Sequence, residues 1–176
     1  MRQLGALTRR LGIDRLLIVT DEAIVKGKPA YADTLRMAHV HHTAGTNSYT
    51  RLQAPAIVRA IQLYHVKGNG WNDIGYNFLV DKYGQVFEGR GGGIDRNVVG
   101  AHAQGFNSQT AGIANVGDYT SVGASQESLA ATATYIRWKL GVHGQPLSGP
   151  VTLRSSGGPL TKYPAGSRVT LERVIG

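Results

Sequence analysis

The segment Met37-Ala38-His39-Val40-His41-His42-Thr43-Ala44-Gly45-Thr46 is the stretch around which the rest of this chain is organised. Apolar residues alternate with histidines at its start, which is typical of a half-buried strand. Side chains alternate along a strand, so His39 and His41 share one face and His42 points to the other. Half of the six histidines lie in this segment, and imidazole is a common metal ligand. The cluster therefore predicts a functional site on this strand.

Composition narrows the classes of partner. At 176 residues the chain has the length of one domain with its own core. The net charge of +8 indicates an anionic partner, either nucleic acid or an acidic cell-wall polymer. The basic residues are scattered, and three Phe and two Trp offer few rings for stacking on bases, so we predict no nucleic-acid partner.

Two absences bear on chemistry and on location. The chain has no cysteine, which excludes disulfides, thiol nucleophiles and thiolate metal ligands within it. No stretch has the ~18 consecutive apolar residues of a membrane span, and residues 1–20 lack the apolar core and cleavage site of a signal peptide. We therefore predict neither a membrane span nor a signal peptide in this chain.

The remaining pattern predicts short strands mixed with two amphipathic helices. We expect strands over residues 16–19, 111–116 and 169–175, a hairpin of 76–80 with 86–88, helices over about 54–67 and 126–140, and a long surface loop over 144–166. This predicts an α/β fold, with a mixed central β-sheet flanked by α-helices in a single domain. Residues 1–35 would form an N-terminal segment, and residues 36–176 the domain.

Caps and turn residues define the helix ends. Gly68-Asn69-Gly70 is expected to stop the first helix. Ser125 is the predicted N-cap of the second helix, and Gly141 its predicted end. The spacing of apolar residues predicts a buried stripe on the second helix that consists of Leu129, Ala133, Ile136 and Leu140.

Several blocks, taken in order and with their spacing, carry a resemblance to one family. They are the histidine strand, Trp71-Asn72-Asp73-Ile74-Gly75-Tyr76-Asn77-Phe78-Leu79-Val80, Phe87-Glu88-Gly89-Arg90 and Gly100-Ala101-His102-Ala103-Gln104-Gly105-Phe106-Asn107. Over about residues 36–141 the chain resembles the type-2 N-acetylmuramoyl-L-alanine amidases, which include the peptidoglycan recognition proteins. The resemblance implies a zinc-dependent hydrolase that cleaves the amide between N-acetylmuramic acid and L-alanine. It also implies a secreted or cell-wall location.

The resemblance further implies a zinc ion, Zn²⁺, held by two His and one Cys, with one coordination position left open for water. His41, which leads the His-x-[Ser/Thr]-Ala motif, matches the first metal ligand. Tyr76 matches the family's tyrosine beside the metal, whose phenol can stabilise a developing oxyanion. The other two ligands follow a Gly-His-Arg-Asp run, which would begin where this chain stops at Gly176. We therefore expect a domain incomplete at its C-terminus, with one zinc ligand of three.

A further set of residues matches positions that bind peptidoglycan in the family. Gly70-Trp71 resembles the pair associated with stem peptides that contain meso-diaminopimelate, and Arg90 the arginine that binds the extra carboxylate of that residue. The expected partner is therefore a muropeptide of the diaminopimelate type. The whole expected substrate-binding set comprises His42, His65, Asn69, Trp71, Arg90, His102 and Asn107. Simple packing is the competing interpretation for Trp71, and ordinary surface or core placement for Arg90 and His65.

Two other hypotheses remain open. The chain could be a non-catalytic recognition module, since two expected zinc ligands are absent from it. Alternatively, His39 and His41, which share one strand face, could begin a different metal site completed by His102 or His143. Without such a metal, His39 is expected to be structural, because the family more often has an apolar residue there.

Overall fold

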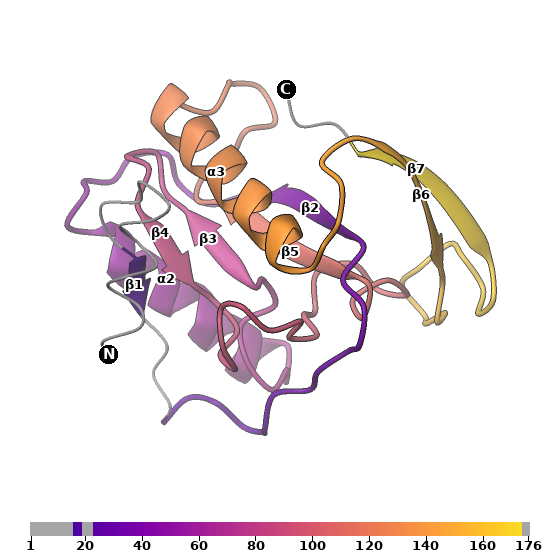
Figure 1. Cartoon of the computed structure of the whole chain (residues 1–176). Coiled ribbons are helices and arrows are strands. Elements are labelled where there is room, and N and C mark those ends of the chain that lie inside the picture. The colour runs from indigo at the N-terminus through magenta and orange to yellow at the C-terminus, as the bar shows by residue number, and fades with distance from the viewer. Residues whose placement is uncertain (1–15, 19–22, 174–176) are drawn as a thin grey trace.

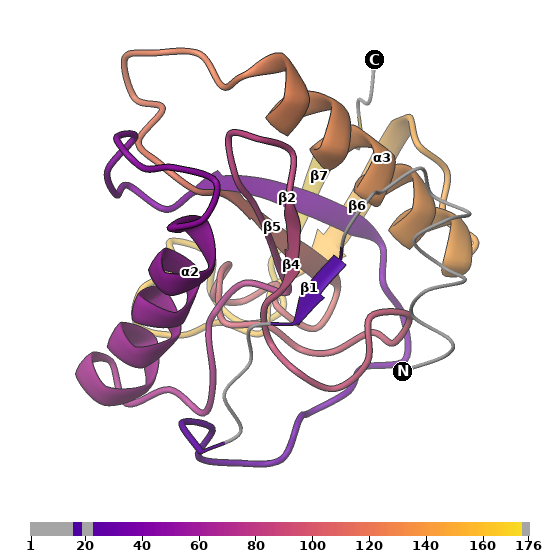
Figure 2. The same ribbon diagram turned by 90° about the vertical axis from the view of Figure 1, so that its left-hand side faces the viewer.

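A mixed β-sheet lies between two helices in the computed structural model, which describes residues 16–18 and 23–173. Figure 1 and Figure 2 show α2 on one face of this sheet and α3 on the other. The elements are β1 (Leu16–Ile18), β2 (Met37–His42), α2 (Ala54–Leu63), η1 (Tyr64–Gly68), β3 (Phe78–Val80), β4 (Val86–Glu88), β5 (Thr110–Asn115), α3 (Gln126–Val142), β6 (Gly149–Arg154) and β7 (Arg168–Arg173).

The central sheet has five strands in the order β1-β4-β3-β5-β2, and a separate two-stranded sheet pairs β6 with β7. The histidine strand β2 is therefore an edge strand, and it pairs in parallel with β5 over its full length. β3 and β4 form the predicted antiparallel hairpin. Its turn is closed by Asp81, whose Oδ1 accepts hydrogen bonds from the backbone N–H groups of Tyr83 and Gln85. Gly84 takes the left-handed conformation, at φ 74°, which glycine adopts without strain.

Each face of the sheet has its own core. On the α3 face, Phe78, Val80 and Ile113 pack against the helix. On the α2 face, Leu79 and Ala114 pack with α2 residues such as Val58. Because alternate strand residues face opposite layers, β2 delivers Ala38 to the α3 side and its histidines at 39 and 41 to the α2 side.

The first helix departs from its prediction in its last turn. The predicted helix over about 54–67 is an α-helix only as far as Leu63, and η1 then continues it as a π-helical turn. The backbone N–H of Asn69 closes this turn on the carbonyl of Tyr64. π-Turns occur frequently at functional sites because they redirect side chains. Here the turn carries His65, one of the expected binding residues.

The second helix confirms its predicted start and the C-terminal half of its buried stripe, since Ile136 and Leu140 are buried. Ser125 caps it, and its side chain accepts a hydrogen bond from the backbone N–H of Ser128. Leu129, however, is 47% exposed, and the helix continues one residue past Gly141. The buried face of α3 is rotated relative to the predicted apolar stripe, because polar residues occupy part of it. The spacing of apolar residues alone does not reveal that these polar residues are buried.

The predicted surface loop over 144–166 is wrong for its first half, because residues 149–154 form β6 and pair with β7. Met37 at the start of β2 and Phe106 pack against Val151 and Leu153 of this hairpin. The backbone N–H of Ser156 also donates to the carbonyl of Gly105. The C-terminal hairpin thus supports the loop before β5, which carries one of the site histidines.

A buried amide joins the sheet to α3. The Oδ1 of Asn115 accepts hydrogen bonds from the hydroxyls of Ser128, at 2.6 Å, and Thr132, at 3.1 Å. All three residues are buried. Buried polar groups of this kind are costly when left without a partner.

We predict that Asn115→Ala lowers the free energy of unfolding by about 1–3 kcal/mol, because it leaves two buried hydroxyls without their acceptor. Urea denaturation monitored by circular dichroism measures this loss. Leu129→Ala, on the exposed side of the same helix, is the control and should change stability by no more than about 0.5 kcal/mol. Equal effects of the two substitutions would contradict the prediction.

Candidate active site

Two histidines of β2 lie beside small residues of the neighbouring strand. His39 is in register with Gly112, and His41 with Ala114. Their rings stand on the α2 face with centroids 6.2 Å apart. Since β5 has no bulky side chain at these positions, space remains over the sheet for a third ring.

His102 occupies that space. It comes from the loop between β4 and β5, and a Cβ at Gly112 or at Gly100 would collide with its imidazole. The side-chain Oδ1 of Asn107 accepts hydrogen bonds from the backbone N–H groups of His102 and Ala103. Two glycines and one Asx-type contact therefore fix the position of the ring.

His39, His41 and His102 form one cluster, called the histidine cluster below. The ring of His102 lies 5.1 Å from that of His41 and 6.1 Å from that of His39, between centroids. Each imidazole offers a nitrogen, and these nitrogens all lie within 4.8 Å of one another. Such a donor set suits zinc and other borderline transition metals.

Three further rings extend from the histidine cluster. Tyr76 lies 5.6 Å from His41 and 5.7 Å from His65, between ring centroids. His65 in turn stacks against Trp71 at 4.8 Å. The Nδ1 of His65 accepts a hydrogen bond from the backbone N–H of Gly75, so its Nε2 carries the proton when the ring is neutral. Tyr76, His65 and Trp71 are called the aromatic row below.

Burial keeps these groups uncharged at neutral pH. Burial lowers the pKa of His41 to about 4, helped by its histidine neighbours. Burial and the adjacent His41 lower the pKa of His102 to about 3. Burial likewise raises the pKa of Tyr76 above its ordinary value, so its phenol remains a hydrogen-bond donor. The site thus offers neutral imidazole lone pairs beside a neutral phenol.

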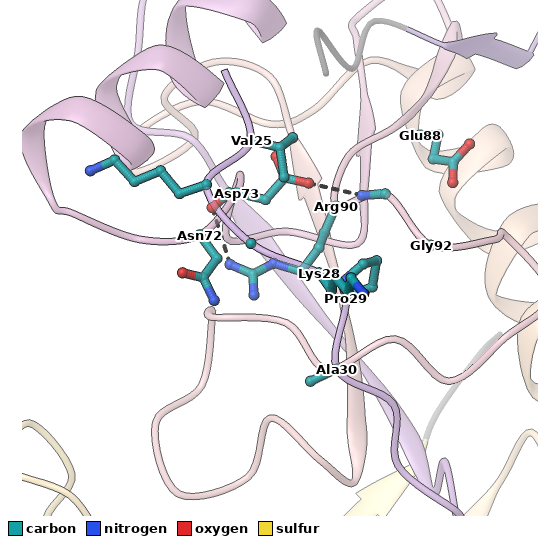
Figure 3. A pocket seen from close by; sticks show the side chains of 12 residues that line it. Val25, Lys28, Pro29, Ala30, Asn72, Asp73, Glu88, Arg90 and Gly92 are labelled. Atoms are coloured by element: carbon teal, nitrogen blue, oxygen red, sulfur yellow. Dashed lines mark hydrogen bonds between the residues drawn. The ribbon is translucent and has the colours of Figure 1, made fainter. Parts of the chain in front are cut away.

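Arg90 lies in the wall of a pocket of about 630 Å³, formed with residues 25–30 and 91–92 among others (Figure 3). Its guanidinium donates to the backbone carbonyls of Ile74, Val99 and Asp73. These contacts hold the side chain in place, and a guanidinium has five N–H donors, so donors remain for a ligand.

Some expected site residues lie elsewhere. His42 faces away from the histidine cluster, and its Nδ1 accepts a hydrogen bond from the backbone N–H of Tyr119. Asn69 is exposed at the end of η1. Asn107 shapes the loop that holds His102. His143 lies at the C-terminal end of α3, so it is not a member of the cluster.

Two buried polar residues support the site and were not singled out from the sequence. Asn77 accepts a hydrogen bond from the backbone N–H of Gly112 and donates to the carbonyl of Val98. Asp73 accepts hydrogen bonds from the side chain of Gln62 and from the backbone N–H of Gly91. Both fall within the Trp71–Val80 block, where polar residues interrupt an apolar run, and that interruption was the available signal.

We predict that neither His41 nor His102 becomes charged above about pH 5 in metal-free protein. Their folded-state pKa values of about 4 and about 3 lie below the ordinary value near 6.5, so the unfolded chain binds protons first as the pH falls. Their contribution to stability is therefore complete above about pH 6.5 and is lost as the pH falls toward 4. Nitrogen-15 NMR titration of the imidazoles measures this, and a midpoint above pH 6 for either ring would contradict it.

Comparison with known proteins agrees with this geometry. Residues 31–155 match the N-acetylmuramoyl-L-alanine amidase family, Amidase_2. The peptidoglycan-recognition protein SC1a/b of Drosophila simulans is 44% identical over 90 residues, which are 51% of this chain and 46% of that relative. The matched part of the chain thus spans less than half the length of that relative.

Solved structures share the fold. Bumblebee PGRP-SA matches with a TM-score of 0.65 at 29% identity, over 74% of this chain and 77% of that one. Peptidoglycan recognition protein-LE in complex with tracheal cytotoxin, a monomeric diaminopimelic acid-type peptidoglycan, matches with a TM-score of 0.56 at 31% identity, over 61% and 62%. The mixed sheet flanked by helices confirms the predicted fold class. The family match extends over most of the chain, and the protein belongs to the N-acetylmuramoyl-L-alanine amidase family.

Proposed function

We propose that this domain binds a diaminopimelate-type muropeptide and hydrolyses the amide between N-acetylmuramic acid and L-alanine. The observation that carries this proposal is the Tyr76 phenol, which lies beside His41 at the end of the histidine strand. A neutral donor next to a potential metal ligand is the arrangement that amide hydrolysis needs. Membership of the amidase family supports the choice of bond.

The proposal gives the groups of the site separate tasks. Zinc, when bound, supplies a Lewis acid and activates water. His41 helps to hold it, and Tyr76 donates a hydrogen bond to the carbonyl oxygen of the scissile amide as negative charge develops there. His65 and Trp71 would bind the substrate through ring faces and through the Nε2 proton of His65.

Arg90 is the residue that, in this proposal, binds the stem peptide. Its guanidinium is held in the pocket wall by three carbonyls and can offer its remaining N–H groups to a carboxylate. The similarity to a recognition protein bound to diaminopimelic acid-type peptidoglycan supports this ligand.

Since peptidoglycan lies outside the cytoplasmic membrane, we place the proposed activity at the cell wall or in the extracellular space. Within the residues that the structure describes, no helix is long and apolar enough to cross a membrane.

Recognition without hydrolysis is the second candidate. It is favoured by the direct hydrogen bond between Nε2 of His41 and Nδ1 of His102, which are 3.0 Å apart. That bond satisfies both nitrogens without any metal. Zinc content and hydrolysis of purified cell walls separate the two candidates.

We predict that Tyr76→Phe lowers the rate of muropeptide hydrolysis by about 10²–10³-fold, as expected for the loss of one oxyanion donor. Binding should change little, because the ring remains in the aromatic row. Product release measured by chromatography gives the rate, and calorimetry gives the affinity. Tyr64→Phe, at a 64% exposed tyrosine on η1, is the control. An active Tyr76→Phe enzyme would remove Tyr76 from this role.

We predict that Arg90→Ala weakens binding of a diaminopimelate-type muropeptide by about 1.5–3 kcal/mol, since a charge-assisted hydrogen bond is lost. A lysine-type muropeptide, which lacks the extra carboxylate, should lose less. Calorimetry with both ligands is the measurement, with a thermal melt to verify folding because Arg90 also bonds three carbonyls. Arg51→Ala, at an arginine near the Tyr83 ring, is the matched control. Equal losses for both ligands would contradict the assignment.

A further inference from the structure

We infer that Lys26 and Lys28 bind the free carboxylate at the C-terminal end of the stem peptide, while Arg90 binds the carboxylate that distinguishes diaminopimelate from lysine. The pocket then selects stem peptides with a free end over those whose end is blocked or cross-linked. This inference rests on the proposed function and names the stem peptides on which that function acts. Both lysines precede the residues that match the amidase family, which begin at residue 31, so the family likeness does not assign them.

Residues 25–30 form one wall of the pocket, and backbone hydrogen bonds hold this wall in place. The backbone N–H of Lys26 donates to the carbonyl of Asn72 at 2.9 Å, and the carbonyl of Ala30 accepts from the backbone N–H of Val99 at 2.9 Å. The segment is therefore attached at both ends to the loops that precede β3 and β5. Its lysines lie on a fixed part of the domain, next to the proposed binding residue.

Close packing fixes the middle of the same wall. A Cβ at Gly27 would lie only 3.2 Å from the side chain of Asn72, and a Cβ at Gly92 would lie 2.9 Å from the ring of Pro29. Both contacts are tighter than an ordinary van der Waals contact, so the two glycines allow the wall to approach the opposite loops. Lys28, between these two contact points, is thereby held at the pocket.

The charges that face the pocket favour an anionic ligand. Its lining contains three cations, Lys26, Lys28 and Arg90, and two carboxylates, Asp73 and Glu88. Asp73 is buried, and three protein N–H groups already donate to its carboxylate. Figure 3 shows the half-buried Glu88 on the side of the pocket away from the guanidinium, whereas Lys28 lies beside the side chain of Arg90. Positive charge therefore predominates around the arginine.

One arginine alone cannot bind both carboxylates of such a ligand. The Nε and both terminal nitrogens of Arg90 each donate to a backbone carbonyl, which leaves one N–H on each terminal nitrogen. A single carboxylate occupies both of these donors. A second carboxylate needs other donors, and each lysine ammonium group offers three.

The two lysines are available for this role. Both are exposed, and among the residues that the structure describes their ammonium groups have neither a hydrogen-bond nor an ion-pair partner. The pocket volume of about 630 Å³ lies within the range of small-molecule sites, about 300–1,000 Å³. The pocket can therefore hold the end of a stem peptide and not only one side chain.

Calorimetry with three diaminopimelate-type muropeptides tests the inference on the chelator-treated full chain, which keeps binding separate from hydrolysis. The first ligand has a free C-terminal carboxylate, the second a C-terminal carboxamide, and the third a free end but a carboxamide at the glutamate of its stem. We expect the first to bind about tenfold more tightly than the second, as for one charge-assisted hydrogen bond. The third should bind like the first.

The double variant Lys26→Gln, Lys28→Gln should bind the free-ended ligand about tenfold more weakly and the C-terminal carboxamide with unchanged affinity. Lys162→Gln, at an exposed lysine in the loop between β6 and β7, removes the same kind of charge and should keep the preference for the free end. Arg90→Ala should weaken binding of both ligands by the same factor. A thermal melt of each variant verifies the fold.

Three results would overturn the inference and leave the proposed function standing. The first is equal affinity of the unmodified chain for the free-ended ligand and its C-terminal carboxamide. The second is a preference for the free end that survives in the folded double variant. The third is a loss of affinity that follows the glutamate carboxamide instead, because the lysines would then bind a different carboxylate. If none of the three muropeptides binds, the proposed function itself fails, and this inference fails with it.

Discussion

The parallel pairing of β2 with β5 is the constraint on which the rest of the site depends. Its register places Gly112 beside His39 and Ala114 beside His41, so the face over these strands is open above the backbone. A larger residue at position 112 would exclude the ring of His102. The same pairing brings Asn115 to α3, where its amide joins the two layers. One strand register thus positions both the histidine cluster and the helix behind it.

The parts that surround the cluster position it from several directions. The C-terminal hairpin packs on Met37 and Phe106 and thereby supports both the start of β2 and the loop of His102. Asn77 holds Gly112 and the chain near Val98 together. Preorganisation of this kind matters because a ligand set that is already ordered loses little freedom when it binds an ion or a substrate.

The proposed function assigns recognition and chemistry to different parts of the molecule. Arg90 lies in a pocket whose lining includes Lys26 and Lys28, which suits the carboxylates of a stem peptide. The histidine cluster and Tyr76 offer neutral donors and lone pairs instead, because burial disfavours charge there. The ring of His65 contacts those of both Trp71 and Tyr76, and in the proposed function these rings would hold the substrate beside Tyr76. In this arrangement, muropeptide binding can persist in a variant that no longer hydrolyses the amide.

The sequence by itself determined the strands of the central sheet, the helix cap at Ser125, the β3–β4 hairpin and the shared face of His39 and His41, because local periodicity and turn chemistry act over a few residues. Blocks in register along the chain also determined the family. Tertiary structure alone decided which third histidine joins that face, since His102 reaches it only through the register of β2 with β5 and through two glycines. It also decided that Leu129 is exposed and that residues 149–154 form a strand. Those outcomes depend on partners distant in sequence, namely Asn115 for the buried face of α3 and Met37 and Phe106 for the hairpin. Local sequence patterns do not identify such partners, because they extend over only a few residues.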